Sequence, residues 1–154
     1  MIEANSVQRL IDLEEIRVLK HRYAKLCDEG YQPEVLASLF AEDAVWDAGP
    51  FGTHQGRAAI AAFFERTGRR IEYAIHYMLN PTITVDGDRA TGSWYLWQVS
   101  VMRETQQALV LMAKYADEYV RSPDGWRFQH VRFTVESFTP WEDGPGKVRF
   151  AKLG

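Results

Sequence analysis

Apolar residues recur at helical spacing through residues 7–28. Positions three or four apart carry Val, Leu, Ile, Tyr or Cys, and charged side chains occupy most of the positions between them. Such a stripe predicts an amphipathic helix that buries one face against the rest of the protein. Gly30 follows and is typical of a residue that ends a helix. We therefore expect one long first helix, with a break near Asp12.

Two shorter helices are expected after the first one. Pro33 suits the first turn of a helix, and the sequence EVLASLF behind it carries an apolar stripe. Residues 57–68 are rich in alanine and finish at Gly68, which predicts a third helix that ends there. The intervening sequence AVWDAGPFGTHQG has Gly and Pro at its centre, so we interpret it as a strand, a turn and a short return strand.

The pattern changes from helical to extended at about residue 72. Two β-rich stretches meet at Asp86-Gly87-Asp88 and two more at Pro123-Asp124-Gly125, and both sites are strong hairpin signals. Helices followed by a meander of strands indicate an α+β fold, a cone-shaped α+β barrel in which three N-terminal helices pack on a strongly curved, mixed or antiparallel sheet. The space between helices and sheet would form a blind pocket.

Composition narrows the class of protein. The chain has 154 residues, of which 46% are hydrophobic, and this suits a single domain over residues 1–154. We expect the core at about residues 7–141 and interpret the Gly/Pro-rich residues 142–154 as a C-terminal arm. That arm would cover the pocket mouth, contact a neighbouring subunit or lie loose.

Charge and cysteine content disfavour several kinds of partner. The net charge of −3 is small and the basic residues are scattered, so we expect no nucleic acid partner. No apolar run approaches the roughly 18 residues of a membrane span, so we expect no membrane partner either. Cys27 is the only cysteine, which rules out an internal disulfide, and the polar, acidic N-terminus is unlike a signal peptide. The expected location is therefore cytoplasmic.

Asp28 and His76 are the most informative pair of titratable residues. Asp28 stands at the end of the first predicted helix, and His76 opens the first of the long strands. A carboxylate that holds one imidazole nitrogen leaves the other free to accept a proton, so the histidine becomes an oriented general base near neutral pH. Alternatively, His76 is a structural residue with an ordinary hydrogen bond, and Asp28 pairs with Lys25.

Signatures of metal and cofactor sites are missing from the sequence. It has no HxxxH, HxH or Cys/His cluster, no Gly-rich phosphate loop and no GxSxG motif. We therefore expect chemistry that needs no metal and no cofactor.

Three segments resemble a known family. They are IHYMLN (75–80), DEYVRSPDGWRF (117–128) and FTPW (138–141). With the order of elements over about residues 7–141, they make the chain similar to the SnoaL-like branch of the nuclear transport factor 2-like superfamily. That α+β cone fold includes scytalone dehydratase, a bacterial bile-acid dehydratase and hexachlorocyclohexane dehydrochlorinase. The resemblance implies that His76 is the catalytic base and Asp28 its carboxylate partner.

Two positions depart from the dehydrochlorinase. The resemblance puts Tyr23 where that enzyme has a lysine and the dehydratases have a tyrosine, and it puts Val131 where the enzyme has an arginine. A phenol with a pKa of about 10 can donate a hydrogen bond or a proton to a departing hydroxyl. The two positions together favour loss of water over loss of halide, with Tyr23 as the third catalytic residue. The alternative for Tyr23, on its apolar stripe, is a core position.

Aromatic residues make up 13% of the chain, and many lie in its second half. Single rings on strands are usually core residues, but several together can line an apolar pocket. Strand alternation, taken with the family's pattern, predicts nine inward-facing residues that contact substrate. These are Trp46, Trp94, Leu96, Gln98, Leu111, Ala113, Tyr115, Val131 and Phe133. Such a pocket suits a small hydrophobic cyclic substrate.

The leading hypothesis is a cofactor-independent lyase of the dehydratase type that acts on a small hydrophobic cyclic hydroxy-ketone or polycyclic substrate. The alternatives are a ketosteroid- or polyketide-type isomerase or cyclase with the same base, and a non-catalytic module that binds small ligands. Tyr95, Trp97 and Val99 would form an apolar patch on the outer face of the sheet, which predicts a homo-oligomer. The resemblance favours a trimer, with a dimer as the alternative.

Overall fold

The structure, a computed structural model, describes residues 4–152 of the chain. Its elements are α1 (Ala4–Asp28), α2 (Pro33–Ser38), β1 (Phe40–Asp47), the short 3-10 helix η1 (Gly49–Phe51), β2 (Thr53–Gln55), α3 (Arg57–Arg70), β3 (Ile71–Asp86), β4 (Arg89–Met102), β5 (Ala108–Ser122), β6 (Gly125–Pro140) and α4 (Gly144–Lys147).

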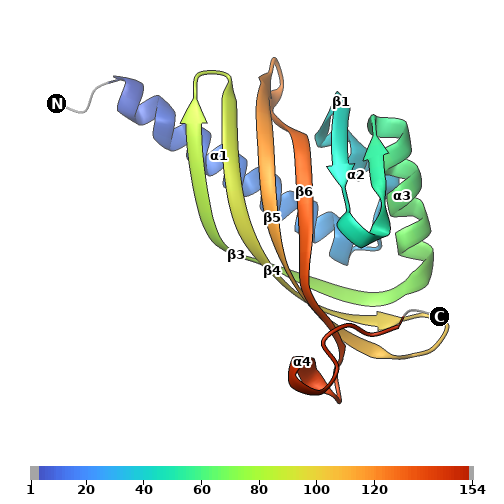
Figure 1. The fold of residues 1–154 in the computed structure, drawn as a ribbon. Coiled ribbons are helices and arrows are strands. Elements are labelled where there is room, and N and C mark those ends of the chain that lie inside the picture. The colour runs from blue at the N-terminus through green and yellow to red at the C-terminus, as the bar shows by residue number, and fades with distance from the viewer. Residues whose placement is uncertain (1–3, 153–154) are drawn as a thin grey trace.

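Six strands form one mixed, curved sheet in the order β2-β1-β6-β5-β4-β3 (Figure 1). β1 lies parallel to β6, and every other pair of neighbouring strands is antiparallel. The predicted α+β class with a curved, mixed sheet is therefore confirmed, although the sheet stays open and does not close into a barrel. The two predicted hairpins are confirmed as well, with turns at Gly87-Asp88 and at Pro123-Asp124.

Helix α1 lies across one face of the sheet, where it contacts β3 and β6 (Figure 1). It is continuous from Ala4 to Asp28, so the predicted break near Asp12 is wrong. The Asp12 carboxylate accepts hydrogen bonds from Arg121 and Trp126 on distant strands. Because those partners occupy the carboxylate, it does not compete for the backbone N–H groups of its own helix.

Three other boundaries differ from the prediction. β1 begins at Phe40, earlier than expected, because that residue pairs with β6. α3 continues through Gly68 instead of ending there. β3 begins at Ile71, so His76 lies within the strand and not at its start. In each case a tertiary contact extends the element beyond its local sequence signal.

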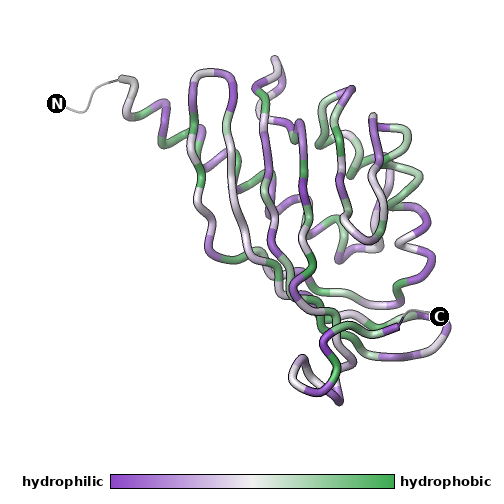
Figure 2. The backbone as a smooth tube through the Cα atoms, viewed as in Figure 1, coloured by the Kyte–Doolittle hydropathy of each residue, from purple (hydrophilic) through white to green (hydrophobic). Residues whose placement is uncertain are grey.

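Hydrophobic and hydrophilic residues are mixed along the long strands (Figure 2), while buried and less buried positions alternate along β4 and β5. The inward face joins the core, while the outward face of β3 and β4 exposes several large apolar side chains. These are Tyr73, Tyr77, Leu79, Tyr95 and Trp97. The homo-oligomer, and the trimer in particular, stay predictions that this patch motivates.

The segment after β6 folds back onto the end of that strand. The backbone N–H of Phe138 donates to the carbonyl of Arg149 at 2.8 Å, and that of Ala151 donates to the carbonyl of Phe138 at 2.6 Å. The predicted C-terminal arm is thus tied to β6 within the described residues. In residues 4–152, no helix has the length and apolar character needed to cross a membrane.

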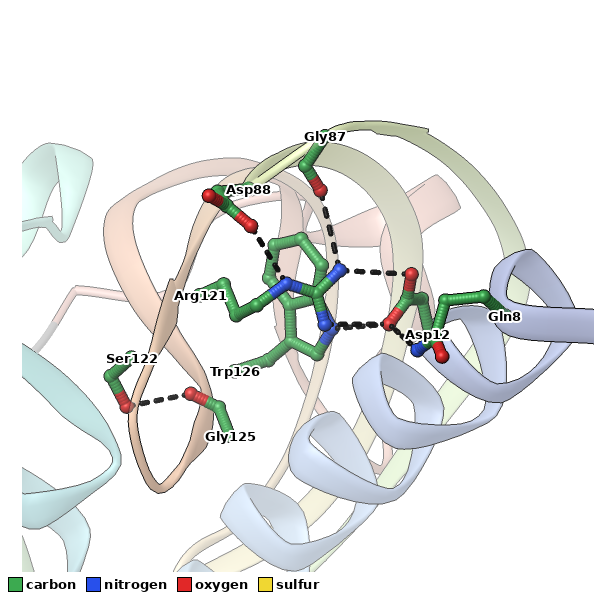
Figure 3. Close-up of polar contacts among 8 residues, drawn as sticks. All are labelled: Gln8, Asp12, Gly87, Asp88, Arg121, Ser122, Gly125 and Trp126. Carbon is green, nitrogen blue, oxygen red and sulfur yellow. Dashed lines mark hydrogen bonds and ion pairs between the residues drawn. The ribbon is translucent and has the colours of Figure 1, made fainter. Parts of the chain in front are cut away.

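Arg121 of β5 joins three segments that are far apart in sequence (Figure 3). Its guanidinium donates hydrogen bonds of 2.8 and 2.9 Å to the two carboxylate oxygens of Asp12 on α1. Its Nε donates to Asp88 in the β3–β4 turn at 2.9 Å, and its Cζ lies 4.5 Å from the centre of a ring of Trp126. This bidentate ion pair holds the first half of α1 against both hairpins.

The hydrogen bonds from Arg121 hold the pKa of the Asp12 carboxyl below its usual value, although burial opposes them. A carboxyl whose pKa is lower in the folded state stabilises the fold above its unfolded-state pKa. That contribution is lost as the pH falls through the folded-state value. The ion pair should therefore stabilise the protein at neutral pH and cease to do so in acid.

We expect Asp12→Asn to lower the free energy of unfolding by about 2–3 kcal/mol at pH 7, because the Arg121 guanidinium loses its charged acceptor. Urea denaturation at one fixed protein concentration measures the change. The gap between variant and wild type should shrink below about pH 4, where the carboxyl of the unfolded chain begins to protonate, and should close as the pH falls through the lower folded-state pKa. Glu14→Gln, which removes an exposed ion pair with Arg17, is the control and should cost less than about 1 kcal/mol. A gap that widens in acid would contradict the prediction.

Candidate active site

The structure brings Asp28 and His76 together. The His76 Nδ1 lies 2.6 Å from the Asp28 Oδ1, and the backbone N–H of His76 donates to the same oxygen at 3.0 Å. The His76 side chain is only 5% exposed and that of Asp28 is 27% exposed. Because the carboxylate accepts at Nδ1, the neutral imidazole carries its proton there and keeps a lone pair on Nε2.

The position of β3 at the edge of the sheet explains this double contact. His76 pairs with Gln98 of β4 on one side, and no strand of residues 4–152 lies next to β3 on the other side. An edge strand leaves backbone N–H groups without strand partners. Asp28, the last residue of α1, supplies the acceptor for one of them. The fold thereby fixes both the backbone and the ring of His76.

Tyr31 lies beside the free nitrogen of His76 and was not predicted from the sequence. Its hydroxyl is 3.4 Å from the His76 Nε2, which is long for a hydrogen bond, and the two rings meet edge to face. The Tyr31 side chain also stacks on Phe64 of α3. A phenol therefore stands next to the nitrogen that would accept a proton.

The turn that carries Tyr31 has an unusual backbone. Tyr31 has a φ of +54°, and Gly30 before it has a φ of +94°. A left-handed conformation is uncommon for a tyrosine and is found mostly where the surroundings enforce it. Gly68 of α3 makes room for this turn, since a Cβ there would lie 3.1 Å from the Gly30 carbonyl oxygen and 3.2 Å from the Tyr31 Cβ. Gly68 thus permits close packing and does not end the helix.

A cavity of about 430 Å³ opens next to His76 and Tyr31. Six residues predicted for the site besides His76 line it, namely Tyr23, Trp46, Gln98, Leu111, Tyr115 and Phe133. The volume falls within the range of about 300–1,000 Å³ that is usual for small-molecule pockets. Most of its wall is aromatic or aliphatic, so an apolar ring compound suits it.

Four predicted contact residues do not line the cavity. Trp94, Leu96, Ala113 and Val131 are instead buried in the hydrophobic core. Trp94 shows the reason most clearly, because its ring packs edge-on against His21 of α1 and its Nε1 donates to the Tyr119 hydroxyl at 3.0 Å. Strand alternation identifies the inward face correctly, but it does not reveal which part of that face α1 covers.

Helix α3 and the chain around η1 supply much of the wall that the prediction missed. The lining residues from these two segments are Pro50, Phe51, Phe63, Phe64, Arg66, Thr67 and Arg70. Ile71, Ser100, Met102 and Phe138 of the strands line the cavity as well. The prediction drew the lining from strands and did not consider the polar positions of the third helix. Arg66 and Arg70 are four positions apart and close to Phe63 in the sequence, and this pattern is the signal from which the wall could have been predicted.

The tyrosines and the cysteine near the cavity stay protonated. Burial raises the pKa of Tyr23 and of Tyr31 well above 10, and the neighbouring Tyr115 and Cys27 add to this effect at Tyr23. Burial also raises the pKa of the Cys27 thiol. The phenols can therefore donate hydrogen bonds, while the thiol is not a nucleophile at neutral pH.

A buried ion pair lies behind the cavity wall. Lys20 of α1 donates to the Asp117 Oδ2 at 2.8 Å, and its Nζ lies 3.4 Å from the centre of the Tyr115 ring. The Tyr119 hydroxyl donates to the same Asp117 oxygen at 2.8 Å. Burial lowers the pKa of Lys20 and raises that of Asp117, and each charge opposes the effect on the other. This network fixes α1 to β5 and so supports the wall at Tyr115.

No group of three or more His, Cys, Asp or Glu side chains within residues 4–152 is arranged to hold a metal ion. The imidazole, the carboxylate and the phenols of the site can support proton transfer at Nε2 and hydrogen-bond donation to an oxygen beside it.

Comparison with known proteins identifies the family. A family model described as the SnoaL-like domain matches residues 8–132, so the chain belongs to the SnoaL-like family. An uncharacterised protein of Mycobacterium tuberculosis is 30% identical over 124 residues, which cover 79% of this chain and 84% of that protein. The gamma-hexachlorocyclohexane dehydrochlorinase of Sphingobium indicum is 27% identical over 107 residues, which cover 68% and 69% of the two chains.

Solved structures agree with this assignment. The hexachlorocyclohexane dehydrochlorinase LinA type 2 superposes with a TM-score of 0.81 at 25% identity, over 96% of this chain and 98% of that one. A scytalone dehydratase-like protein of Novosphingobium aromaticivorans has a TM-score of 0.80 at 22% identity, over 86% and 89% of the two chains. The predicted membership in the nuclear transport factor 2-like superfamily, with its cone fold, is confirmed.

We expect neutral His76 to carry its proton on Nδ1 and none on Nε2, because the Asp28 carboxylate accepts at Nδ1. Nitrogen NMR of the histidine rings in labelled protein distinguishes the two forms. Asp28→Ala should abolish the preference, whereas the ring signals of His130, which lies beside Arg132, should not change. A neutral His76 protonated on Nε2 would contradict the assignment of Nε2 as the basic atom.

Proposed function

We propose that this protein is a cofactor-independent carbon–oxygen lyase of the dehydratase type, acting on a small hydrophobic cyclic hydroxy-ketone. The observation that carries the proposal is the imidazole of His76, which Asp28 holds at Nδ1 and which lines an apolar cavity beside a protonated phenol. Membership in a family whose relatives include a dehydrochlorinase supports an elimination reaction in general.

In the proposed reaction, the His76 Nε2 removes a proton from the carbon next to the substrate carbonyl. The Asp28 carboxylate stabilises the imidazolium that results. The hydroxyl of Tyr31 or of Tyr23 donates a hydrogen bond to the carbonyl oxygen while negative charge develops on it. The C–O bond at the next carbon then breaks, a C=C bond forms, and the departing hydroxyl takes the proton from the imidazolium and leaves as water.

Loss of water is favoured over loss of halide by the residues at the two positions where this chain departs from the dehydrochlorinase. Tyr23, at the position that the resemblance assigns to a lysine in the dehydrochlorinase, is a buried phenol. Val131, at the position of that enzyme's arginine, is buried in the core and lines no part of the cavity. A phenol suits a departing hydroxyl or an enolate oxygen, and neither of these two positions carries the cationic side chain that the resemblance gives the dehydrochlorinase.

We expect His76→Gln to lower kcat/KM by on the order of 10²–10⁴-fold, because the base is lost while the cavity keeps its shape. Purified protein is screened against cyclic hydroxy-ketones by mass spectrometry, where dehydration removes one water. His130→Gln is the matched control, since His130 does not line the cavity, and it should leave the rate unchanged. Retained activity in His76→Gln would exclude this residue as the base.

The same screen separates the alternative functions. A product of unchanged mass would identify an isomerase or cyclase that uses the same base and returns the proton to carbon. Saturable binding without turnover of any compound would identify a ligand-binding module.

Tyr31→Phe should lower kcat on the order of 10²-fold and leave KM nearly unchanged, because it removes an oxyanion donor but keeps the ring that stacks on Phe64. Tyr23→Phe is the comparison, since the resemblance assigns the role of third catalytic residue to Tyr23. Steady-state kinetics of both variants on the same substrate decides between the two phenols. A larger loss of kcat in Tyr23→Phe would return the role to Tyr23.

A further inference from the structure

Two arginines of α3 line the cavity that His76 also lines. Arg66 and Arg70 are one helical turn apart, so their side chains leave the same face of the helix. Arginine side chains present fixed forks of N–H donors that match the geometry of carboxylate, sulfonate and phosphate groups. A wall that is otherwise mainly apolar therefore contains two cationic groups.

The nearby carboxylates are engaged by other arginines. Glu65 pairs with Arg69 at 2.5 Å, and Glu72 pairs with Arg103 at 2.5 Å. Within the part of the chain that the structure describes, neither Arg66 nor Arg70 forms an ion pair. A cation near the C-terminal end of a helix is favourable in itself and accounts for a basic last turn. A cation at this helix end need not line the cavity, as Arg69 shows, because it lies near the same end and is not a lining residue. The helix dipole therefore does not explain why Arg66 and Arg70 line the cavity.

The rest of the cavity adds hydrogen-bond donors but no negative charge. No Asp or Glu is among its lining residues in the described chain. The Nε1 of Trp46, a lining residue that is 4% exposed, is a buried donor without an acceptor. The hydroxyls of Tyr23 and Tyr31 are protonated because burial raises their pKa values. These donors and the two positive charges together favour a ligand that is rich in acceptor oxygens and negatively charged.

His54, near Arg66, neither balances nor adds to the positive charge of the two arginines. Its ring stacks on Phe63 with centroids 4.5 Å apart, next to the cavity wall. Burial lowers the pKa of His54, and the positive charge of nearby Arg66 lowers it further. His54 is therefore neutral at pH 7, so the ring next to Arg66 adds no charge to this wall.

We propose that the ligand of this cavity is an organic acid: its apolar ring lies against the aromatic wall, and its anionic group binds Arg66 and Arg70. The proposal rests on the proposed function only in taking this cavity as the ligand site. An anion held at the two arginines would fix the orientation of the ring relative to the His76 Nε2. Selection for acidic substrates would then come from α3, while proton abstraction comes from β3 and the end of α1.

A matched pair of fluorescent probes tests the proposal. Anilinonaphthalene sulfonate carries an anionic group on an aromatic skeleton, and phenylnaphthylamine has the same skeleton without the charge. We expect the Arg66→Gln/Arg70→Gln double variant to raise the Kd of the sulfonate roughly tenfold or more, as loss of charged hydrogen bonds predicts. The Kd of the neutral probe should stay within about twofold. In the wild type the two probes should compete.

Arg69→Gln is the control, because it removes one positive charge from the same helical turn at a side chain outside the cavity wall. It should leave the Kd of both probes unchanged. Equal weakening of both probes in the double variant, an equal effect of Arg69→Gln, absence of competition, or no binding of the sulfonate to the wild type would each overturn the proposal. The test measures binding and not turnover, so its outcome is independent of whether the protein proves to be a dehydratase.

Discussion

The Asp28 carboxylate accepts two hydrogen bonds from one residue, His76, and the candidate site depends on this contact. One bond satisfies a backbone N–H on an edge strand, and the other fixes the imidazole. Because the same oxygen serves both, the direction of the ring is set by the backbone of β3 and not by a side-chain rotamer alone. The end of α1 and the middle of β3 therefore have to stay in register for the base to point into the cavity.

Local sequence patterns predict the parts of this fold that local contacts determine. The two Gly-containing hairpin turns and the extended period after about residue 72 were sufficient to indicate the sheet. The continuity of α1 was missed because it depends on Arg121, which lies 109 positions from Asp12. The extension of β1 to Phe40 likewise depends on pairing with β6. Contacts of this kind leave no periodic trace in the sequence.

The candidate site likewise has residues that the local sequence predicts and residues that it does not. Asp28 and His76 could be paired from a helix end, a strand and a family motif, whereas Tyr31 could not, because its direction follows from two consecutive left-handed residues. That turn also needs the missing Cβ of Gly68 on another helix. Glycine after a helix commonly signals the helix end. Nothing in the local sequence predicts that the side chain of the next residue lies beside a histidine 45 positions away.

The positively charged residues of the cavity come from a different element in this chain than in the dehydrochlorinase it resembles. At position 131 the resemblance implies an arginine in the dehydrochlorinase, and here a buried valine pairs with Trp46 of β1. The cations of this cavity belong instead to α3, on a different wall. Since β3 and α1 fix the imidazole of His76, the positive charge can move from strand to helix without disturbing the proposed proton abstraction. In such a fold the base and the charge selectivity can change independently, and a shared histidine therefore does not imply a shared substrate.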